Sequence, residues 1–543
     1  MSRIATVSEL WGKPVNEEPD MSEGKRKSAG RRGRAARLIV REQAQLERAK
    51  VVWPGITGGA IKPLTDRELE RVHEAALQIL ESIGMGDASP EIIELARKKG
   101  LTITDDQRIL FSRAYIEDMV AGAARNFTLY GRERRHDIEL TGSKVHFGTA
   151  GAAVSVLDPK TGKFRPSTLR DEYDFARLAD RLPNIHWFGR TVVPTEMEGG
   201  LGMDVNITYA LAAGTTKHVG VGFTVGAGVE AAAKIFDLIL GGEGRFAEQP
   251  CCTLYCTGIV PPLRYGELSL EVASAAVRVG MPIDMIIAAQ AGATAPAALA
   301  GTLVQTAAEG LGGIAMVNLL KPGHPTIFSN WPLTSDLRTG AFSGGGPEEA
   351  LLNAASAQIS NFYDLPSGCA AGMTDSKVPD NQSGVEKAIN VLMTGLAGAN
   401  MIHESAGMQA SLLGCCFEAM AIDSEMLGFV LRVLRGIEVN DETLSVDLIK
   451  EVVNGPGHFL GSDQTLRLME SEYIYPELGD RLQPALWEEL GGLDIQARAK
   501  TYVQQILSTH YPTYIDPAAD TKIRDAYKIV LDPADMQPGN GRW

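Results

Sequence analysis

The pattern of apolar positions differs between the beginning, the middle and the end of the chain. Near the beginning, Val72, Ala76 and Leu80 recur at the spacing of one helix face, which predicts an amphipathic helix. Thr65 followed three residues later by Glu68 has the form of a capping box, so we expect this helix to begin there. Two further helices complete an α-rich N-terminal region and are expected at residues 90–99 and 112–124.

After about residue 165, short apolar runs alternate with longer helical stretches. Apolar runs of this kind are typical of parallel strands that helices cover on both faces. Seven such repeats favour a TIM (β/α)8 barrel over a doubly wound sheet, and the pattern does not locate the eighth strand. The expected strands lie at residues 185–193, 217–224, 251–258, 282–290, 326–331, 367–372 and 399–405.

The segments on either side of the repeats complete the expected organisation. Residues 145–157 contain Gly148 and Gly151 and predict a β-hairpin that helps to close or plug one end of the barrel. Near the other end of the chain, residues 441–453 predict a capped amphipathic helix. We therefore expect four parts: a basic, disordered arm (1–50), an α-rich N-terminal region with the β-hairpin (51–165), the TIM-barrel core (166–411) and a helical C-terminal extension (412–543).

The charge of the chain argues against nucleic acid as a partner of the barrel. The net charge is −15, from 52 basic and 67 acidic residues, so bulk electrostatics would repel a polyanion. Residues 25–50 depart from this average, because they carry ten basic residues. Such an arm is either a solvated tail or a contact for nucleic acid or an acidic partner, and the solvated tail is the interpretation we favour.

Composition also bears on the location of the protein. No apolar run approaches the roughly 20 residues needed to cross a bilayer, and the first residues lack the apolar stretch of a signal peptide. The six cysteines include two adjacent pairs, Cys251-Cys252 and Cys415-Cys416, and six in 543 residues do not form a disulfide scaffold. We therefore expect a cytoplasmic protein with no membrane contact and reduced thiols.

In a TIM barrel, functional side chains follow the C-terminal ends of the strands. Several of these positions are aromatic, and rings grouped at strand ends form cages that bind quaternary ammonium ions. The alternative is that each ring belongs to the core. The candidate substrate-binding residues are Tyr255, Gln290, Phe328, Trp331, Arg338, Phe342 and His403, with Phe147 as a further possible ring.

Three other features have a functional and a structural interpretation. His403, followed by Glu404, ends the last expected strand and would act as an acid, a base or an anion partner, or serve only the structure. The glycine-rich stretch 342–347 precedes a helix and would bind an anion or simply turn. The cysteine pairs suggest a zinc site, but Cys251 and Cys252 point to opposite faces of a strand, which favours buried inert thiols.

Several segments together resemble the trimethylamine methyltransferase family, in its branch without pyrrolysine. The resemblance extends over roughly residues 55 to 520, leaves the basic arm outside, and is closest in character to glycine betaine:corrinoid methyltransferases. The chain contains only standard residues, whereas the founding trimethylamine enzymes use pyrrolysine. The segments that carry the resemblance are VHFGTAGAAVSVLD, DLRTGAFSGGGPEEALLNAA, LPSGCAAGMTDSKVPDNQSGVEKA, GANMIHESAG and LRGIEVNDETLSVDLIKEV.

The resemblance implies a TIM-barrel enzyme that transfers a methyl group from a methylated amine, in our prediction a betaine, to the Co(I) of a corrinoid. The corrinoid (cobalamin) would be carried by a partner protein or be free, the enzyme would hold no metal of its own, and a homo-oligomer is plausible. The alternatives are a non-catalytic osmolyte-binding or sensing barrel and a zinc-dependent thiol methyltransferase. The residues expected to face the corrinoid are Asn330, Asp336, Asp375, Ser376, Lys377 and Asp380.

Overall fold

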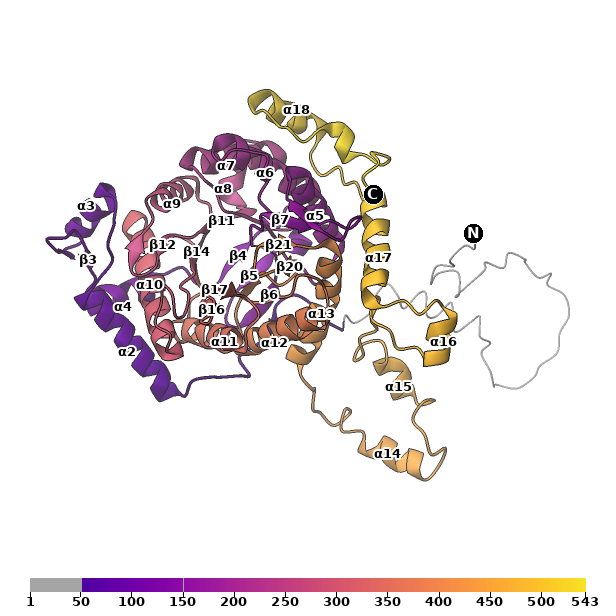
Figure 1. Ribbon diagram of the computed structural model, residues 1–543. Helices are drawn as coiled ribbons and strands as arrows, with labels where there is room; N and C mark the ends of the chain where they lie inside the picture. The colour runs from indigo at the N-terminus through magenta and orange to yellow at the C-terminus, as the bar shows by residue number, and fades with distance from the viewer. Residues whose placement is uncertain (1–50, 150) are drawn as a thin grey trace. The chain divides into compact units, whose positions relative to one another are not determined.

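Eight short parallel strands curl into a closed barrel in the computed structural model, which describes residues 51–149 and 151–543 (Figure 1). β19 pairs in parallel with β6, and a bridge between Gly148 and Trp187 joins the end of β6 to β9, so the ring closes. This confirms the predicted TIM barrel. Its strands are β6 (Lys144–Phe147), β9 (Phe188–Gly189), β10 (Val219–Val221), β11 (Cys252–Cys256), β14 (Ile283–Ile287), β15 (Thr326–Asn330), β18 (Ser367–Ala370) and β19 (Met401–His403).

A helix follows each strand, and these helices surround the barrel (Figure 1). Strands and helices alternate because each strand is apolar on both faces. One face points into the barrel, and a helix covers the other. The barrel elements run from Lys144 to Arg435, beyond both limits of the interval 166–411 expected from the sequence. The helices are α5 (Leu169–Arg181), α6 (Leu201–Gly214), α7 (Gly226–Leu240), α9 (Glu267–Val279), α10 (Leu299–Leu320), α11 (Pro347–Phe362), α12 (Asn381–Ala397) and α13 (Phe417–Arg435).

The prediction of a β-hairpin at residues 145–157 is wrong. β6 pairs with β19 and, antiparallel, with β1 (Ile56–Thr57), whereas β7 (Ser155–Leu157) pairs with β8 (Phe164–Pro166). Gly148 is not a turn residue: a Cβ there would lie 2.1 Å from the Trp187 ring, so the glycine makes room for an aromatic side chain.

A hairpin does plug one end of the barrel, but it comes earlier in the chain. It consists of β4 (Phe127–Leu129) and β5 (Ile138–Leu140), which pair antiparallel. Their apolar side chains form one buried cluster with residues from the starts of barrel strands, so the hairpin closes the N-terminal end of the barrel. The cluster consists of Leu129, Ile138, Leu140, Trp187, Ile327 and Met401.

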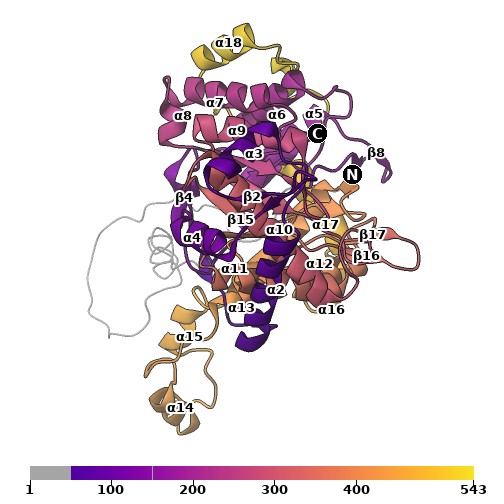
Figure 2. The same cartoon turned by 90° about the vertical axis from the view of Figure 1, so that its left-hand side faces the viewer.

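The N-terminal helices form as the sequence predicts. The Thr65–Glu68 capping box starts α2 (Asp66–Ser82), and α3 (Pro90–Lys98) and α4 (Arg113–Gly122) follow. α2 lies along α10 (Figure 2). The prediction that no apolar run is long enough to cross a bilayer is wrong for α10, because its 22 residues are long and apolar enough to do so. In the structure 83% of that stretch is buried inside the fold.

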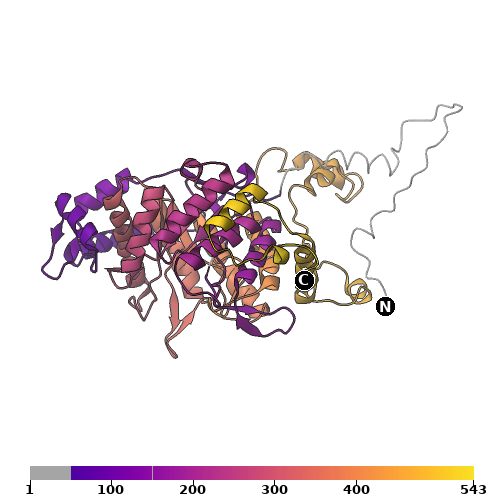
Figure 3. The same ribbon diagram turned by 90° about the horizontal axis from the view of Figure 1, so that it is seen from above.

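The C-terminal extension is helical, as predicted, and part of it packs on the barrel. α17 (Ile495–Thr509) contacts α13 and α5, and α18 (Pro517–Ala526) contacts α7. In Figure 3 the yellow α18 lies across the magenta barrel helices, whereas the orange helices that follow the barrel extend to one side. The helix expected from residue 441 starts only at Val446. The other helices are α14 (Val446–Val453), α15 (Asp463–Leu468) and α16 (Pro484–Glu489).

Candidate functional site

Glycines on neighbouring strands give large aromatic rings a place inside the barrel. A Cβ on Gly220 of β10 would lie 2.0 Å from the Tyr255 ring, and one on Gly189 of β9 would lie 2.6 Å from the Tyr255 hydroxyl. The Tyr255 ring therefore extends over both strands from β11. The same relation holds between Gly148 and Trp187.

Three rings contact His403 at the C-terminal end of β19. The ring centroids of Trp187, Tyr255 and Trp331 lie 5.2, 5.3 and 4.9 Å from that of His403. Trp187 Nε1 donates a hydrogen bond of 3.0 Å to the Tyr255 hydroxyl, and Trp331 Nε1 donates one of 2.9 Å to Ser329 Oγ. The polar edges of both tryptophans are thus satisfied, and we call Trp187, Tyr255, Trp331 and His403 the aromatic cluster.

A carboxylate lies beside this cluster. His403 Nε2 is 3.0 Å from Asp284 Oδ2, and neither side chain is exposed to solvent. The contact lacks the alignment of a hydrogen bond, and within the described ranges His403 Nδ1 has no partner either. A buried acid and a buried imidazole with unused hydrogen-bonding capacity mark a functional site, because buried polar groups in a fold are normally satisfied.

Two buried glutamates complete the polar groups of this region. Glu404 and Glu349 are fully buried; among the described residues Glu404 has no hydrogen-bond partner, and the Thr334 side chain is the polar group beside Glu349. Burial raises the pKa of Glu404 from its ordinary 4.5 to about 8. Burial also raises the pKa of Glu349, and the neighbouring carboxyls of Asp375 and Glu404 raise it further. Two uncompensated carboxyls favour a cationic ligand.

A pocket of about 640 Å3 opens beside the hairpin of β16 (Thr334–Asp336) and β17 (Ala341–Ser343), which follows barrel strand β15. Polar side chains at its wall are already engaged: Asp336 holds Arg338 through Nε and Nη2, and Lys377 Nζ donates to the backbone carbonyl of Asp375. Five residues selected from the sequence line this pocket, namely Asp336, Arg338, Phe342, Asp375 and Lys377.

Phe342 connects the pocket of about 640 Å3, which we call the mouth pocket, to the aromatic cluster. It packs against the buried group of Ile286, Trp331, Ala370 and Met373, and Tyr255 packs against the same group. Nearby, Gln290 Nε2 lies 3.5 Å from the backbone carbonyl of Thr334. The structure therefore brings together five of the seven residues expected to bind substrate, namely Tyr255, Gln290, Trp331, Phe342 and His403.

Other selected residues lie elsewhere. Phe328 and Asn330 point to the outer face of β15, where a Cβ on Gly310 of α10 would contact both side chains. The reason is the two-residue alternation of a strand, which turns Ile327 and Ser329 inward instead. Phe147 likewise packs outward, near Gly395 of α12. Arg338 is 89% exposed at the hairpin.

Two further residues of the 375–380 segment shape the backbone. Ser376 Oγ donates to the Val378 carbonyl, and Asp380 caps α12 by accepting from Ser383 N at 3.0 Å. One amide of the glycine-rich stretch 342–347 is already engaged, because Gly344 N donates to Asp375 Oδ1.

Sequence reasoning missed Trp187, Asp284 and Glu349. Asp284 had a signal, since it is the one charged residue in the apolar strand Ile283–Ile287. Trp187 and Glu349 had none, because a strand tryptophan and a helical glutamate are ordinary without knowledge of their burial. The cysteines are all buried, and burial raises the pKa values of their thiols, which disfavours thiolate ligands. In the described ranges no three His, Cys, Asp or Glu side chains cluster as metal ligands.

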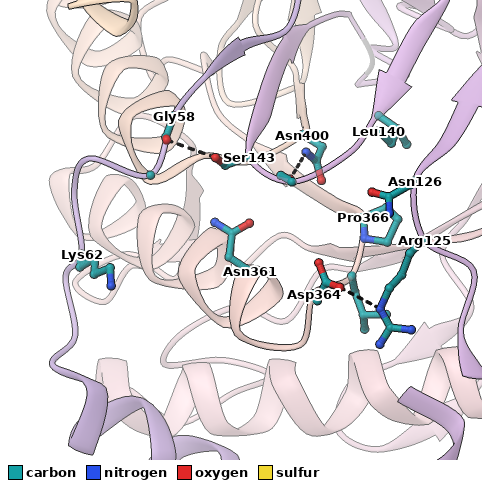
Figure 4. Close-up of a pocket in the computed structure, with 13 residues that line it drawn as sticks. Gly58, Lys62, Arg125, Asn126, Leu140, Ser143, Asn361, Asp364, Pro366 and Asn400 are labelled. Carbon is teal, nitrogen blue, oxygen red and sulfur yellow. Dashed lines mark hydrogen bonds and ion pairs between the residues drawn. The ribbon is translucent and has the colours of Figure 1, made fainter. Parts of the chain in front are cut away.

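A second pocket, of about 340 Å3, lies at the N-terminal end of the barrel (Figure 4). Its polar groups serve the fold: Asn400 Nδ2 donates to the Gly142 carbonyl at 2.8 Å, and Arg125 Nε lies 3.1 Å from Asp364 Oδ2. Residues at the N-terminal end of a TIM barrel usually stabilise the fold, whereas functional side chains lie at the C-terminal end. We therefore place the functional site at the C-terminal end.

Comparisons with known proteins identify relatives that match most of the chain. Residues 30–528 match the family model described as trimethylamine methyltransferase (MTTB), so the match starts within the arm that the sequence analysis left outside. The chain is 31% identical to the trimethylamine methyltransferase of Desulfitobacterium hafniense, over 93% of this chain and 99% of that protein. It is 30% identical to a glycine betaine methyltransferase of the same species, over 85% and 95%. The crystal structure of the Methanosarcina barkeri monomethylamine methyltransferase aligns with a TM-score of 0.47 at 14% identity, covering 82% of this chain and 87% of that one.

Proposed function

The chain belongs to the trimethylamine methyltransferase family, and from that premise we propose that it moves a methyl group from a quaternary methylated amine to the Co(I) of a corrinoid. The substrate class we propose is the betaines. A curated relative at 30% identity is a glycine betaine methyltransferase, which supports this choice.

The aromatic cluster is the single observation that carries the proposal. Trp187, Tyr255 and Trp331 surround His403 with three rings inside the barrel, and rings of this kind attract a quaternary ammonium through their quadrupoles. Tyr255 keeps part of its surface exposed although it lies inside the barrel, which indicates reachable space beside the rings. An ammonium held there would lie close to Glu404, which forms no ion pair among the described residues.

The charge of the substrate decides how much chemistry the protein has to supply. A quaternary ammonium departs as a neutral amine when its methyl group is attacked, whereas a neutral tertiary amine would depart as an amide anion. The Co(I) electron pair forms the bond to the methyl carbon, and the pair of the breaking C–N bond stays on nitrogen. The chain then has to remove water from the ammonium and align its methyl group.

Residues of this chain divide these tasks. Trp331 and Tyr255 would hold the ammonium, and His403 Nδ1, which has no partner, would donate to the carboxylate of a betaine. The mouth pocket lined by Asp336, Asp375 and Lys377 is the surface we assign to the corrinoid or its carrier protein. Because Arg338 is exposed and tied to Asp336, we no longer assign it to the substrate carboxylate.

The test is methyl transfer to cob(I)alamin by the purified chain. We expect methylcobalamin to form with glycine betaine, carnitine or another betaine, and not with trimethylamine. Tight binding of a betaine without transfer would favour an osmolyte-binding barrel. No methylcobalamin with any quaternary amine would contradict the proposal.

A further inference from the structure

Three carboxyl groups gather where the aromatic cluster meets the mouth of the barrel, and among the described residues only one of them has several hydrogen-bond donors. Asp375 accepts hydrogen bonds from Ser343 Oγ at 2.7 Å and from Gly344 N at 2.8 Å. Glu349 and Glu404 are more deeply buried; among the described residues Glu404 accepts no hydrogen bond, and the Thr334 side chain is the hydrogen-bonding group beside Glu349. The described residues thus provide several donors for the outer carboxyl and few for the two inner ones.

Another buried glutamate shows that this fold can satisfy such a group. Glu172 of α5 is also fully buried, yet its carboxyl accepts from Thr191 N and from Val192 N, the latter at 2.8 Å. That arrangement ties a helix to the end of β9 and needs no ligand. Among the described residues Glu404 has no equivalent donors, so a structural role of the same kind does not account for it.

The described groups around Glu404 are apolar, aromatic or acidic. A Cβ on Gly151 would lie 2.4 Å from Glu404 Oε2 and 2.6 Å from the sulfur of Met408 in β20 (Met408–Gln409). Tyr255 from β11 and Glu349 from α11 face it electrostatically, and Asp375 faces Glu349 from the loop after β18. Within the described part of the chain, no Lys, Arg or His forms an ion pair with either glutamate.

We propose that Glu404 recognises the positive charge of the substrate by exchanging its own proton for it, while Glu349 keeps its proton and stays neutral, so that only one carboxylate forms beside the ammonium. In the empty site both groups are neutral acids, which avoids two unpaired charges in an apolar barrel. When a quaternary ammonium enters the aromatic cluster, Glu404 releases its proton to solvent and becomes the counter-charge. Its pKa, which burial raises to about 8, agrees with a proton held at neutral pH.

This inference rests on the proposed substrate class and adds to it a selection against neutral molecules. A neutral amine or a methyl-branched carbon isostere offers no charge to offset an ionised Glu404. It would bind to the rings alone and release no proton. The site would therefore discriminate by charge as well as by shape.

The experiment measures protons released on binding, by titration calorimetry of the full chain at pH 7 in buffers with different ionisation enthalpies. Glycine betaine is the probe, and 3,3-dimethylbutanoate, which has a carbon in place of the charged nitrogen, is its matched control. We expect about one more proton released with the betaine than with the isostere. Glu404→Gln should abolish this difference and weaken betaine binding about tenfold, whereas Glu91→Gln, an exposed first-turn glutamate of α3, should change neither.

Infrared spectroscopy of the empty protein separates failure of this inference from failure of the proposed function. At pH 7 a protonated buried carboxyl gives a C=O stretching band that Glu404→Gln and Glu349→Gln should each reduce. If no betaine binds, the substrate assignment is wrong, and the band still decides the state of the pair. Equal proton release for betaine and isostere, or a band that neither variant changes, would overturn the inference.

Discussion

His403 Nε2 lies 3.0 Å from Asp284 Oδ2, although two strands separate β19 from β14 in the barrel. Only the curvature of a closed sheet brings these two side chains together across its interior. The contact joins the last strand of the barrel to a middle one and orients the imidazole among three aromatic rings. It therefore contributes both to the closure of the barrel and to the site.

The first prediction concerns this pair. His403→Ala should lower the free energy of unfolding by about 3 kcal/mol, because it leaves Asp284 as an unpaired buried acid. The double variant His403→Ala/Asp284→Ala should be more stable than the sum of the single effects predicts, and urea denaturation measures all three. Strictly additive effects would show that the two side chains do not interact.

The architecture could be predicted from the sequence because repeated apolar strands and capped helices are local signals. The eighth strand, β6, could not, since the glycine that directly follows it has a role visible only in three dimensions: Gly148 makes room for the ring of Trp187, which precedes β9. Phe328 shows a similar limit. The sequence locates it on a barrel strand, but not on which face, because a continuous apolar run has no polar positions to reveal the alternation.

The sequence predicts those site residues that stand at the ends of recognisable strands. His403, Trp331 and Tyr255 stand at the ends of recognisable strands, and they meet in the structure. Glu349 comes from a helix that follows a hairpin, and no local pattern connects it with Glu404. A single sequence does not predict which residues meet through tertiary packing, whereas it does predict which residues stand at the ends of strands.

The second prediction tests the rings. Trp331→Leu should reduce kcat/KM for a quaternary amine about tenfold, since one cation–π contact in a desolvated site contributes roughly 1–2 kcal/mol. Trp53→Leu is the control, because Trp53 is 43% exposed and stacks on Arg435. The assay is methylcobalamin formation at varied substrate concentration. An unchanged kcat/KM in Trp331→Leu would remove the ring from the substrate site.

The third prediction tests the space that glycine provides. Gly220→Ala places a methyl group 2.0 Å from the Tyr255 ring, which has to move, so we expect a loss of about 1–3 kcal/mol in stability and of most betaine affinity. Gly384→Ala in α12 has open space and should stabilise the protein by about 0.5–1 kcal/mol. Thermal unfolding and calorimetric titration report the two effects. Retained betaine affinity in Gly220→Ala would show that the position of Tyr255 does not matter.

The fourth prediction follows from the pH dependence of a buried acid. The pKa of Glu404 is about 8 in the fold and near 4.5 when exposed, so the folded state binds its proton more tightly. Between these two values, stability has to fall as pH rises, because folding then requires a proton that the unfolded chain has already lost. Glu404→Gln removes this requirement and should raise the free energy of unfolding at pH 8 by about 2–4 kcal/mol, with little effect at pH 5. Urea denaturation at the two pH values checks this; a variant that is less stable than the parent at pH 8 would mean that the ionised carboxylate is compensated by the protein, and that Glu404 is no longer available as the counter-charge of a substrate.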